Sequence, residues 1–300
     1  MHNVVRVTEH LCARHAGEKD AERRRLRLVS TRAGDAWLVD DEGDFWRTYL
    51  FVEGSHALDS ARRPEDGYQA ARAFGGFLAD LADLPGTDLV ETIAGFHDLD
   101  ARMQALTRAA RTDAFGRLPD ARAELARAEA LHARVARILG GADPLPRRVV
   151  HNDCKLNNVL LDDITGRGLC VIDLDTVMEG TVLCDFGDLV RSAASSSPED
   201  ERDLDNIRFE LDRFEALTRG YLDGVGAQLS RPERAALALA GPRMTLETGV
   251  RFLTDHLEGD VYFRTGRSAH NLDRCRCQLT LAERMLDALA AARRIVDAAG

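Results

Sequence analysis

The chain has 300 residues, of which 45 % are hydrophobic and 30 % are charged, so it is long enough to bury a substantial core. Its 50 acidic and 40 basic residues give a net charge of −10. This balance argues against binding to nucleic acid or to an anionic membrane, because both favour basic surfaces. The sequence contains no apolar run of bilayer length and no secretory signal pattern. We therefore expect a cytoplasmic protein whose six cysteines are reduced.

The N-terminal part of the sequence predicts short strands joined by turns. Strands are predicted at residues 27–30, 37–40 and 45–52. The segments between them, 34–35 and 41–43, contain glycine and aspartate, which are typical of turns. The strand pattern ends at residues 53–55. We therefore expect a small antiparallel unit ahead of the remainder of the chain.

The rest of the sequence is mostly helical and is interrupted once by further strands. Apolar residues recur at every third or fourth position from Pro64 until Pro85-Gly86 breaks the pattern. A second helix is predicted at residues 120–139, and a linker rich in glycine and proline at 140–146. Further strands are predicted at residues 148–150, 159–161 and 169–174, and the pattern is helical from Cys184 onward. A small sheet ahead of a mainly helical body predicts an α+β fold.

A polar loop between two apolar strands carries the chemistry. It reads His151-Asn152-Asp153-Cys154-Lys155-Leu156-Asn157-Asn158, and a further carboxylate, Asp173, ends an apolar strand 20 positions after Asp153. Phosphoryl transfer from ATP needs a carboxylate to orient the attacking hydroxyl, oxygen ligands for Mg²⁺ and a cation near the moving phosphate. Asp153 suits the first role and Lys155 suits the third. Asn158 and Asp173 suit the second role as magnesium ligands.

The spacing His151-x-Asp153-x-Lys155-x-x-Asn158 resembles the H-R-D-x-K-x-x-N catalytic loop of protein kinases. Asn152 stands where that loop has arginine. This asparagine and the Ile172-Asp173 pair look more like the aminoglycoside phosphotransferase branch of the superfamily.

This resemblance implies a protein-kinase-like fold with two lobes and with ATP and Mg²⁺ as cofactors. Residues 1–53 would be the remnant of a truncated, β-containing N-terminal lobe, and residues 54–300 would form a large helical catalytic lobe. The hinge between the lobes falls at Phe51, Val52 and Glu53, and its backbone groups would bind the adenine of ATP.

A literal Asp-Phe-Gly at residues 185–187 suggests a different metal ligand, which we reject. That triplet binds magnesium in protein kinases, but Asp185 is too distant from Asp153 in the sequence and begins a predicted helix. In the resembling family, an aspartate at this point caps the helix and supports the catalytic loop from beneath. We therefore expect Asp185 and His151 to support the loop rather than to bind metal.

Longer segments of the chain resemble N-acetylhexosamine 1-kinases, which phosphorylate the anomeric hydroxyl of GlcNAc or GalNAc with ATP. These segments are residues 3–11, 84–98, 152–158, 172–178 and 251–263. The resemblance implies a sugar substrate. The side chains available to bind it are Arg251, Asp255, Tyr262 and Arg264, followed by Asn271 and Arg274. The alternative is that these arginines and aspartates pair with each other on a solvated surface.

The start of the sequence departs from such kinases, which place a glycine-rich loop and a strand lysine over the phosphates. Neither precedes Trp37, and Lys19 belongs to a charged stretch, residues 17–25, that is predicted to be helical. Either the chain begins late or this member functions without those elements. The alternatives to a sugar kinase are a kinase for aminoglycosides or amino alcohols and a catalytically silent kinase-like binding protein.

Overall fold

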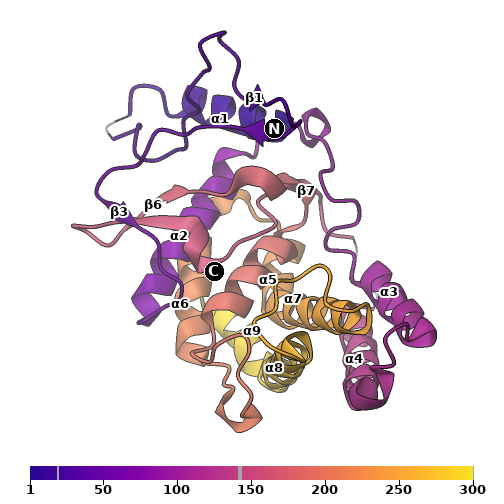
Figure 1. The fold of residues 1–300 in the computed structure, drawn as a ribbon. Coiled ribbons are helices and arrows are strands. Elements are labelled where there is room, and N and C mark those ends of the chain that lie inside the picture. The colour runs from indigo at the N-terminus through magenta and orange to yellow at the C-terminus, as the bar shows by residue number, and fades with distance from the viewer. Residues whose placement is uncertain (19, 141–143, 300) are drawn as a thin grey trace.

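The structure is a computed structural model that describes residues 1–18, 20–140 and 144–299 (Figure 1). Its α-helices are α1 (His2–Arg14), α2 (Pro64–Asp80), α3 (Leu99–Thr112), α4 (Leu118–Leu139), α5 (Val182–Ala193), α6 (Leu211–Val225), α7 (Arg231–Leu257), α8 (His270–Asp287) and α9 (Leu289–Ala298). Its strands are β1 (Leu38–Val39), β2 (Phe45–Trp46), β3 (Ser55–His56), β4 (Arg148–Val150), β5 (Val159–Asp162), β6 (Gly168–Val171) and β7 (Met178–Gly180). Within the described residues, no helix has the length and apolar character that crossing a bilayer would require.

The N-terminal part consists of α1 and a small antiparallel unit that lies above the helical body in Figure 1. β1 pairs with β2 in antiparallel fashion, and Leu28 forms an isolated antiparallel bridge with Tyr49. Phe45, Trp46 and Phe51 of this unit are exposed. The predicted antiparallel unit is confirmed, although β1 and β2 are each only two residues long.

Two further small sheets hold the polar loop between them. β3, β5 and β6 form one antiparallel sheet, and β4 pairs with β7 in the other. The polar loop leaves the end of β4 and enters β5, so each of its ends is attached to a different sheet. The backbone N–H of Ile172, just after β6, donates to the carbonyl of Asn158 (2.9 Å). This bond places the segment that carries Asp173 beside the end of the polar loop.

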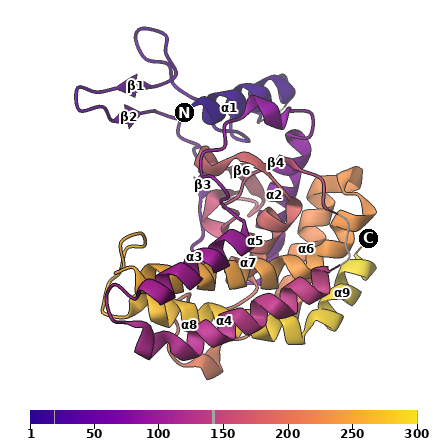
Figure 2. The same cartoon turned by 90° about the vertical axis from the view of Figure 1, so that its right-hand side faces the viewer.

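The helical body is built around α7, which packs against α3, α5 and α8, while α2 packs against α6. Figure 2 shows α3, α4, α7 and α8 running across the lower part of the molecule. The largest fully buried side chains include Phe74, Phe186, Phe214 and Tyr221. The predicted helical character of the chain after Cys184 is confirmed for the described residues.

Two expectations about the strands are wrong. The strand pattern does not end at residues 53–55, because Ser55 and His56 form β3 and pair with β5. The strand expected at residues 169–174 ends at Val171, because Asp173 adopts a left-handed backbone (φ 61°) that a strand cannot contain.

The helix expected at residues 17–25 is also absent from the described part of that stretch, which forms turns. Gly17 and Asp20 have positive φ angles of 84° and 60°, and an α-helix of L-residues excludes this conformation. Lys19 itself lies outside the described residues, as do residues 141–143 of the predicted linker.

Close contact between α2 and α6 depends on glycines. A Cβ atom at Gly75 would lie 2.3 Å from the carbonyl oxygen of Tyr221 and 2.9 Å from the backbone nitrogen of Val225. A Cβ atom at Gly76, the next residue of α2, would meet nothing within 4 Å. The close approach of the two backbones at this point therefore depends on Gly75.

These neighbouring glycines provide a matched test of the packing. We expect Gly75→Ala to lower the free energy of unfolding by roughly 2 kcal/mol or more, because the helices must separate to admit the methyl group. Gly76→Ala should raise it by about 0.5–1 kcal/mol, since alanine favours the helix and the site is open. Urea denaturation of both variants measures the difference, and equal destabilisation by both would contradict this account.

Candidate active site

The polar loop is held from beneath by one buried carboxylate. Asp185 lies in the first turn of α5 and is 1 % exposed. Its carboxylate oxygens accept hydrogen bonds from the backbone N–H groups of His151 (3.0 Å) and Asn152 (2.7 Å). Burial raises the pKa of the Asp185 carboxyl, while His151 and these two backbone bonds act in the opposite direction. Both oxygens of Asp185 are thus occupied by the loop, as expected for a residue that supports it.

His151 connects the loop to the segment that carries Asp173. Its Nε2–H donates to the carbonyl of Ile172 (2.9 Å), and its own carbonyl accepts a hydrogen bond from Oγ1 of Thr176 (2.7 Å). The imidazole is fully buried and makes edge contacts with Phe74 and Phe77. These contacts fix the position of the loop relative to the end of β6.

Asp153, Lys155 and Asn158 converge at the open side of the loop. Lys155 Nζ lies 3.0 Å from Asp153 Oδ2, and the two side chains are 40 % and 25 % exposed. Asn158 Nδ2 donates to the carbonyl of Asp153 (2.8 Å) and to its Oδ2 (3.0 Å). The amide nitrogen of Asn158 therefore faces Asp153, which leaves its amide oxygen available as a ligand.

The surroundings of Asp173 fit a divalent cation. Burial raises the pKa of the Asp173 carboxyl, and the neighbouring Asp153 and Asp175 carboxylates raise it further. A cation among these carboxylates would relieve their repulsion. Together with the Asn158 oxygen, Asp173 offers the hard oxygen donors that Mg²⁺ prefers. This donor set fits magnesium.

Arg47 belongs to the same neighbourhood, although the sequence analysis did not identify it. It follows β2, and its guanidinium nitrogens donate to both carboxylate oxygens of Asp175. This pairing raises the pKa of Arg47 and lowers the pKa of Asp175. The contact joins the N-terminal unit to the segment that carries Asp173. The two residues are 128 positions apart, so no local pattern could have paired them.

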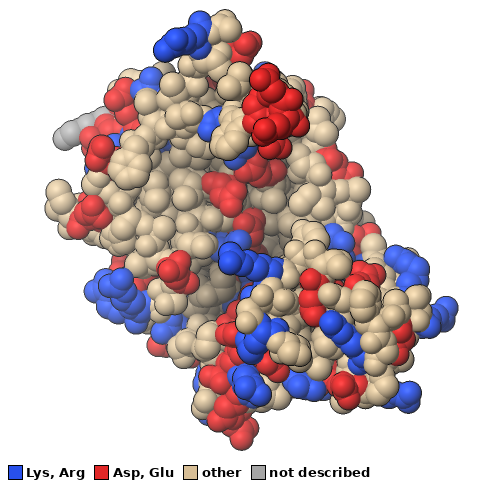
Figure 3. Space-filling view, viewed as in Figure 1, with Lys and Arg blue, Asp and Glu red and all other residues tan. Residues whose placement is uncertain are grey.

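A cavity of about 450 Å³ opens beside the loop; we call it the acceptor cavity. Asp153 and Lys155 lie on its wall together with Arg251, Tyr262 and Arg264. Figure 3 shows this face of the molecule, which is hollowed between the N-terminal part and the helical body and has acidic atoms at its centre and basic atoms below them. The structure thus brings two of the predicted catalytic residues together with three of the predicted substrate residues.

Arg251 is held in the acceptor cavity by aromatic rings. Its guanidinium carbon lies 5.2 Å from the ring centroid of Phe96, 5.7 Å from that of Tyr262 and 5.4 Å from that of Phe263. Such cation–π contacts orient an arginine without neutralising its charge. Arg274 also lines the cavity and lies over the ring of Phe252 (5.3 Å). The cavity therefore presents aromatic faces and cationic hydrogen-bond donors.

Asp255 does not belong to the cavity wall, contrary to the sequence-based expectation. It is 3 % exposed, and its carboxylate accepts hydrogen bonds from the backbone N–H groups of Val261 (2.9 Å), Tyr262 (2.8 Å) and Phe263 (3.0 Å). Asn271 Nδ2 donates to the same carboxylate (2.8 Å). Asp255 and Asn271 therefore shape the loop that presents Tyr262, which leaves no oxygen of Asp255 directed at a substrate.

The three hinge residues are separate from the acceptor cavity and its lining. Phe51 is 79 % exposed, whereas Val52 is buried. The carbonyl of Val52 accepts a hydrogen bond from Ser55 Oγ (2.7 Å), and the carbonyl of Glu53 accepts one from Arg23 Nε (3.0 Å). Adenine recognition at this hinge stays a prediction.

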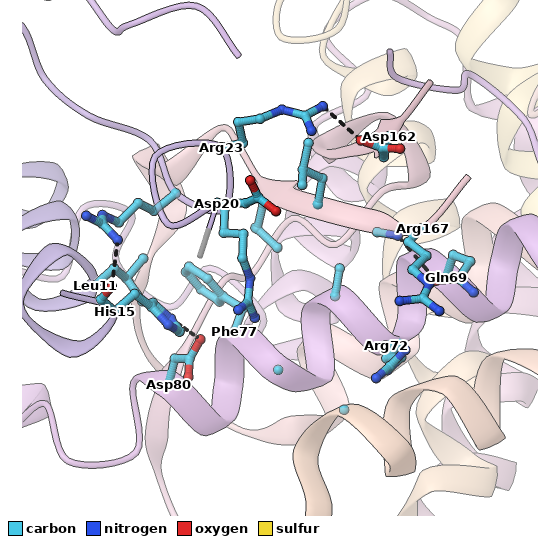
Figure 4. A pocket seen from close by; sticks show the side chains of 18 of the residues that line it. Leu11, His15, Asp20, Arg23, Gln69, Arg72, Phe77, Asp80, Asp162 and Arg167 are labelled. Atoms are coloured by element: carbon cyan, nitrogen blue, oxygen red, sulfur yellow. Dashed lines mark hydrogen bonds and ion pairs between the residues drawn. The ribbon is translucent and has the colours of Figure 1, made fainter. Parts of the chain in front are cut away.

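A second cavity, of about 550 Å³, is lined by residues that include members of α1, α2 and the β5–β6 hairpin (Figure 4). None of the predicted site residues lines it. Two ion pairs join charged side chains of its lining: His15 Nε2 lies 2.7 Å from Asp80, and Arg23 lies 2.9 Å from Asp162. Because Asp153 and Asp173 are elsewhere, we do not assign the chemistry to this cavity.

The fold and the loop define a kinase-like phosphotransferase. Residues 3–222 match the model of the phosphotransferase enzyme family, and the chain belongs to this family. An aminoglycoside phosphotransferase from Alicyclobacillus acidocaldarius is structurally similar, with a TM-score of 0.61 and 17 % identity over 98 % of this chain and 84 % of that one. A choline/ethanolamine kinase family protein from Mesorhizobium loti has a TM-score of 0.54 and 18 % identity over 97 % and 84 %. AMP-bound spectinomycin phosphotransferase has a TM-score of 0.54 and 11 % identity over 92 % and 84 %.

These comparisons confirm the expected phosphotransferase family and the kinase-like fold, with a small β-containing N-terminal part and a mostly helical remainder. At identities this low, the likeness extends to the fold alone. The acceptor has to be argued from the residues of the cavity.

The position of Asp185 leads to a stability prediction. Asp185→Ala should lower the free energy of unfolding by roughly 3 kcal/mol or more, because two buried N–H groups would lose a charged acceptor. Urea denaturation measures this loss. As a control, Asp66, which is 8 % exposed and accepts from the backbone N–H groups of Arg62 (3.0 Å) and Arg63 (3.1 Å), caps α2 away from the loop. Asp66→Ala should cost only about 1 kcal/mol. An Asp185→Ala variant as stable as the Asp66→Ala variant would contradict the support role.

Proposed function

We propose that this protein transfers the γ-phosphate of ATP to the anomeric hydroxyl of an N-acetylhexosamine in a magnesium-dependent reaction. The observation that carries the proposal is that Asp153 and Lys155 border the acceptor cavity while Asn158 and Asp173 adjoin them. A hydroxyl held in this cavity would be beside the carboxylate and the cation that phosphoryl transfer requires.

In this reaction the role of each residue follows from its charge. The Asp153 carboxylate accepts a hydrogen bond from the attacking hydroxyl and orients it. Lys155 stabilises negative charge on the moving phosphate. Asn158 and Asp173 would bind Mg²⁺, which neutralises charge on the phosphates when it is present. Asp185 and His151 keep the loop in place while Asp153 acts.

The charge of the acceptor cavity favours a sugar without amino groups over a polycationic aminoglycoside. Its charged lining residues are the cations Lys155, Arg191, Arg251, Arg264 and Arg274 and the carboxylates Asp153, Asp188 and Glu199. Arg191 lies 2.8 Å from Asp188 and 2.7 Å from Glu199, so these two carboxylates are already paired. An ammonium-rich acceptor would meet Arg251 and Arg264, which form no ion pair with any described residue, and this like-charge contact is unfavourable. Aromatic faces and arginine donors suit sugar rings and an acetamido carbonyl.

The first prediction from this proposal concerns the acceptor. ADP release should be supported by GlcNAc or GalNAc in preference to glucose, galactose, choline and kanamycin. A preference for choline or kanamycin over both acetamido sugars would overturn the substrate assignment and leave phosphotransfer standing. No ADP release with any acceptor would favour the catalytically silent alternative.

The second prediction concerns Asp153. Asp153→Asn keeps the shape of the side chain but removes the charge that accepts the hydroxyl proton, so turnover should fall at least about 10²-fold. Binding of ATP should change little, because Asn158 and Asp173 remain. Steady-state rates and nucleotide titrations on both proteins measure the two effects. Unchanged turnover would exclude the role of Asp153.

The third prediction concerns Asp173 and pH. Because the pKa of Asp173 is raised in the folded protein, protons compete with Mg²⁺ from a higher pH than at an ordinary aspartate. Affinity for Mg²⁺ should therefore fall as pH is lowered from neutral to mildly acidic. By the same linkage, the apo protein gains stability from Asp173 as pH falls and loses it as pH rises through the raised pKa.

Asp173→Ala is the matching variant. It should abolish magnesium-dependent nucleotide binding and change the melting temperature of the apo protein little, since relief of the repulsion between carboxylates offsets the strain of alanine in the left-handed backbone at this position. Calorimetric Mg²⁺–nucleotide titrations and thermal melts test both parts. Tight, pH-independent Mg²⁺ binding by this variant would exclude Asp173 as a ligand.

A further inference from the structure

His97 lies where the acceptor cavity meets the polar loop. It belongs to the segment between α2 and α3, lines the cavity and has a side chain that is 7 % exposed. Its Nε2 lies 2.9 Å from the carbonyl oxygen of Asn152, and its Nδ1 lies 2.7 Å from Oε1 of Glu247 on α7. The Arg243 guanidinium donates to the carbonyl of His97 (2.7 Å) and holds its backbone. The imidazole is therefore fixed between the helical core and the loop.

Both ring nitrogens of His97 face oxygen atoms, and the nature of these oxygens determines where the protons lie. A backbone carbonyl can only accept, so Nε2 carries a hydrogen and donates it to Asn152. The close contact between Nδ1 and the Glu247 oxygen requires a second proton between them. The side chain of Glu247 is 0 % exposed and also lies 3.7 Å from the guanidinium of Arg243, so the buried carboxylate is held between His97 and Arg243.

The peptide group that leads into Asp153 is thereby held at both ends. His97 donates to the carbonyl of Asn152 at one end of this peptide group. The N–H of Asp153 at the other end donates to Nδ1 of His151 (3.3 Å). Asn152 has a left-handed backbone (φ 65°), a conformation that persists only where its surroundings enforce it. The orientation of this peptide plane sets the direction in which the Asp153 side chain leaves the backbone.

We propose that His97, backed by Glu247, is a positioning residue that clamps the Asn152–Asp153 peptide and so directs the Asp153 carboxylate at the acceptor hydroxyl. The inference rests on the proposed phosphotransfer function. His97 acts through Asn152 and does not touch the reacting atoms. Its hydrogen bonds reach Asn152 and Glu247 and do not contact Asn158 or Asp173, so its loss should disturb Asp153 more than the proposed metal ligands.

The test compares His97→Ala with His97→Gln. His97→Ala should lower kcat by roughly 10- to 100-fold, since a displacement of about 1 Å at a reacting group has consequences of that size. The KM for ATP should change much less than kcat. His97→Gln keeps an N–H that can donate to the Asn152 carbonyl, and it should recover part of the lost rate. A kcat equal to that of the unmodified protein in both variants would overturn the proposal.

A double-variant cycle separates positioning from general damage to the fold. In an Asp153→Asn background, His97→Ala should cause no further loss of the residual turnover, because the group that it positions is already disabled. His15→Ala is the matched control: the His15 side chain is 9 % exposed and lies 2.7 Å from Asp80, outside the acceptor cavity. It should lower the melting temperature without changing kcat. Equal rate losses of His97→Ala in both backgrounds would overturn the clamp.

Amide hydrogen exchange tests the clamp independently of activity. His97→Ala should accelerate exchange in residues 151–158, including the N–H of Asp153, and His15→Ala should not. If the unmodified protein phosphorylates no acceptor, the proposed function fails, while the exchange pattern still decides whether His97 holds the loop. Unaltered protection of residues 151–158 in His97→Ala would overturn the inference.

Discussion

The carboxylate of Asp185 is the constraint on which the geometry of the site depends. A buried carboxylate is costly unless its oxygens are satisfied, and here the partners are the two backbone N–H groups at the start of the polar loop. The charge that α5 buries is therefore stabilised only when the loop takes this conformation. Because α5 packs against α7, the position of the loop is tied to the helical core.

The remaining groups of the site lie on two sides of that loop. Towards the N-terminal part, Asp173 and Asp175 follow the end of β6, and Arg47 neutralises Asp175 but not Asp173. Asp173 keeps a raised pKa, so Mg²⁺ at this carboxylate would compete with a proton. The pairing by Arg47 thus separates the roles of two aspartates that are almost adjacent in the sequence.

Towards the C-terminal part, the loop borders a cavity that is lined by residues from α7 and the segment after it. Arg251 is oriented by aromatic rings instead of a carboxylate, so its hydrogen-bonding capacity and its charge remain available to a ligand. Asp255 shapes this wall by binding backbone N–H groups. The same residue types that suggest sugar binding in the sequence therefore divide into residues that line the cavity and residues that only support it.

The sequence by itself determined the family and the α+β character, and it singled out the candidate catalytic loop, because Asp153, Lys155 and Asn158 lie within six residues of one another and Asp173 ends a recognisable strand. Local spacing is sufficient when the backbone between two residues is short and regular. Only the tertiary structure decided that Arg47 meets Asp175, that His97 joins Glu247 to Asn152, and that Asp255 faces inward. The residues in the first two of these contacts are between 55 and 150 positions apart, and their meeting depends on how the helices and small sheets pack, which no local pattern encodes.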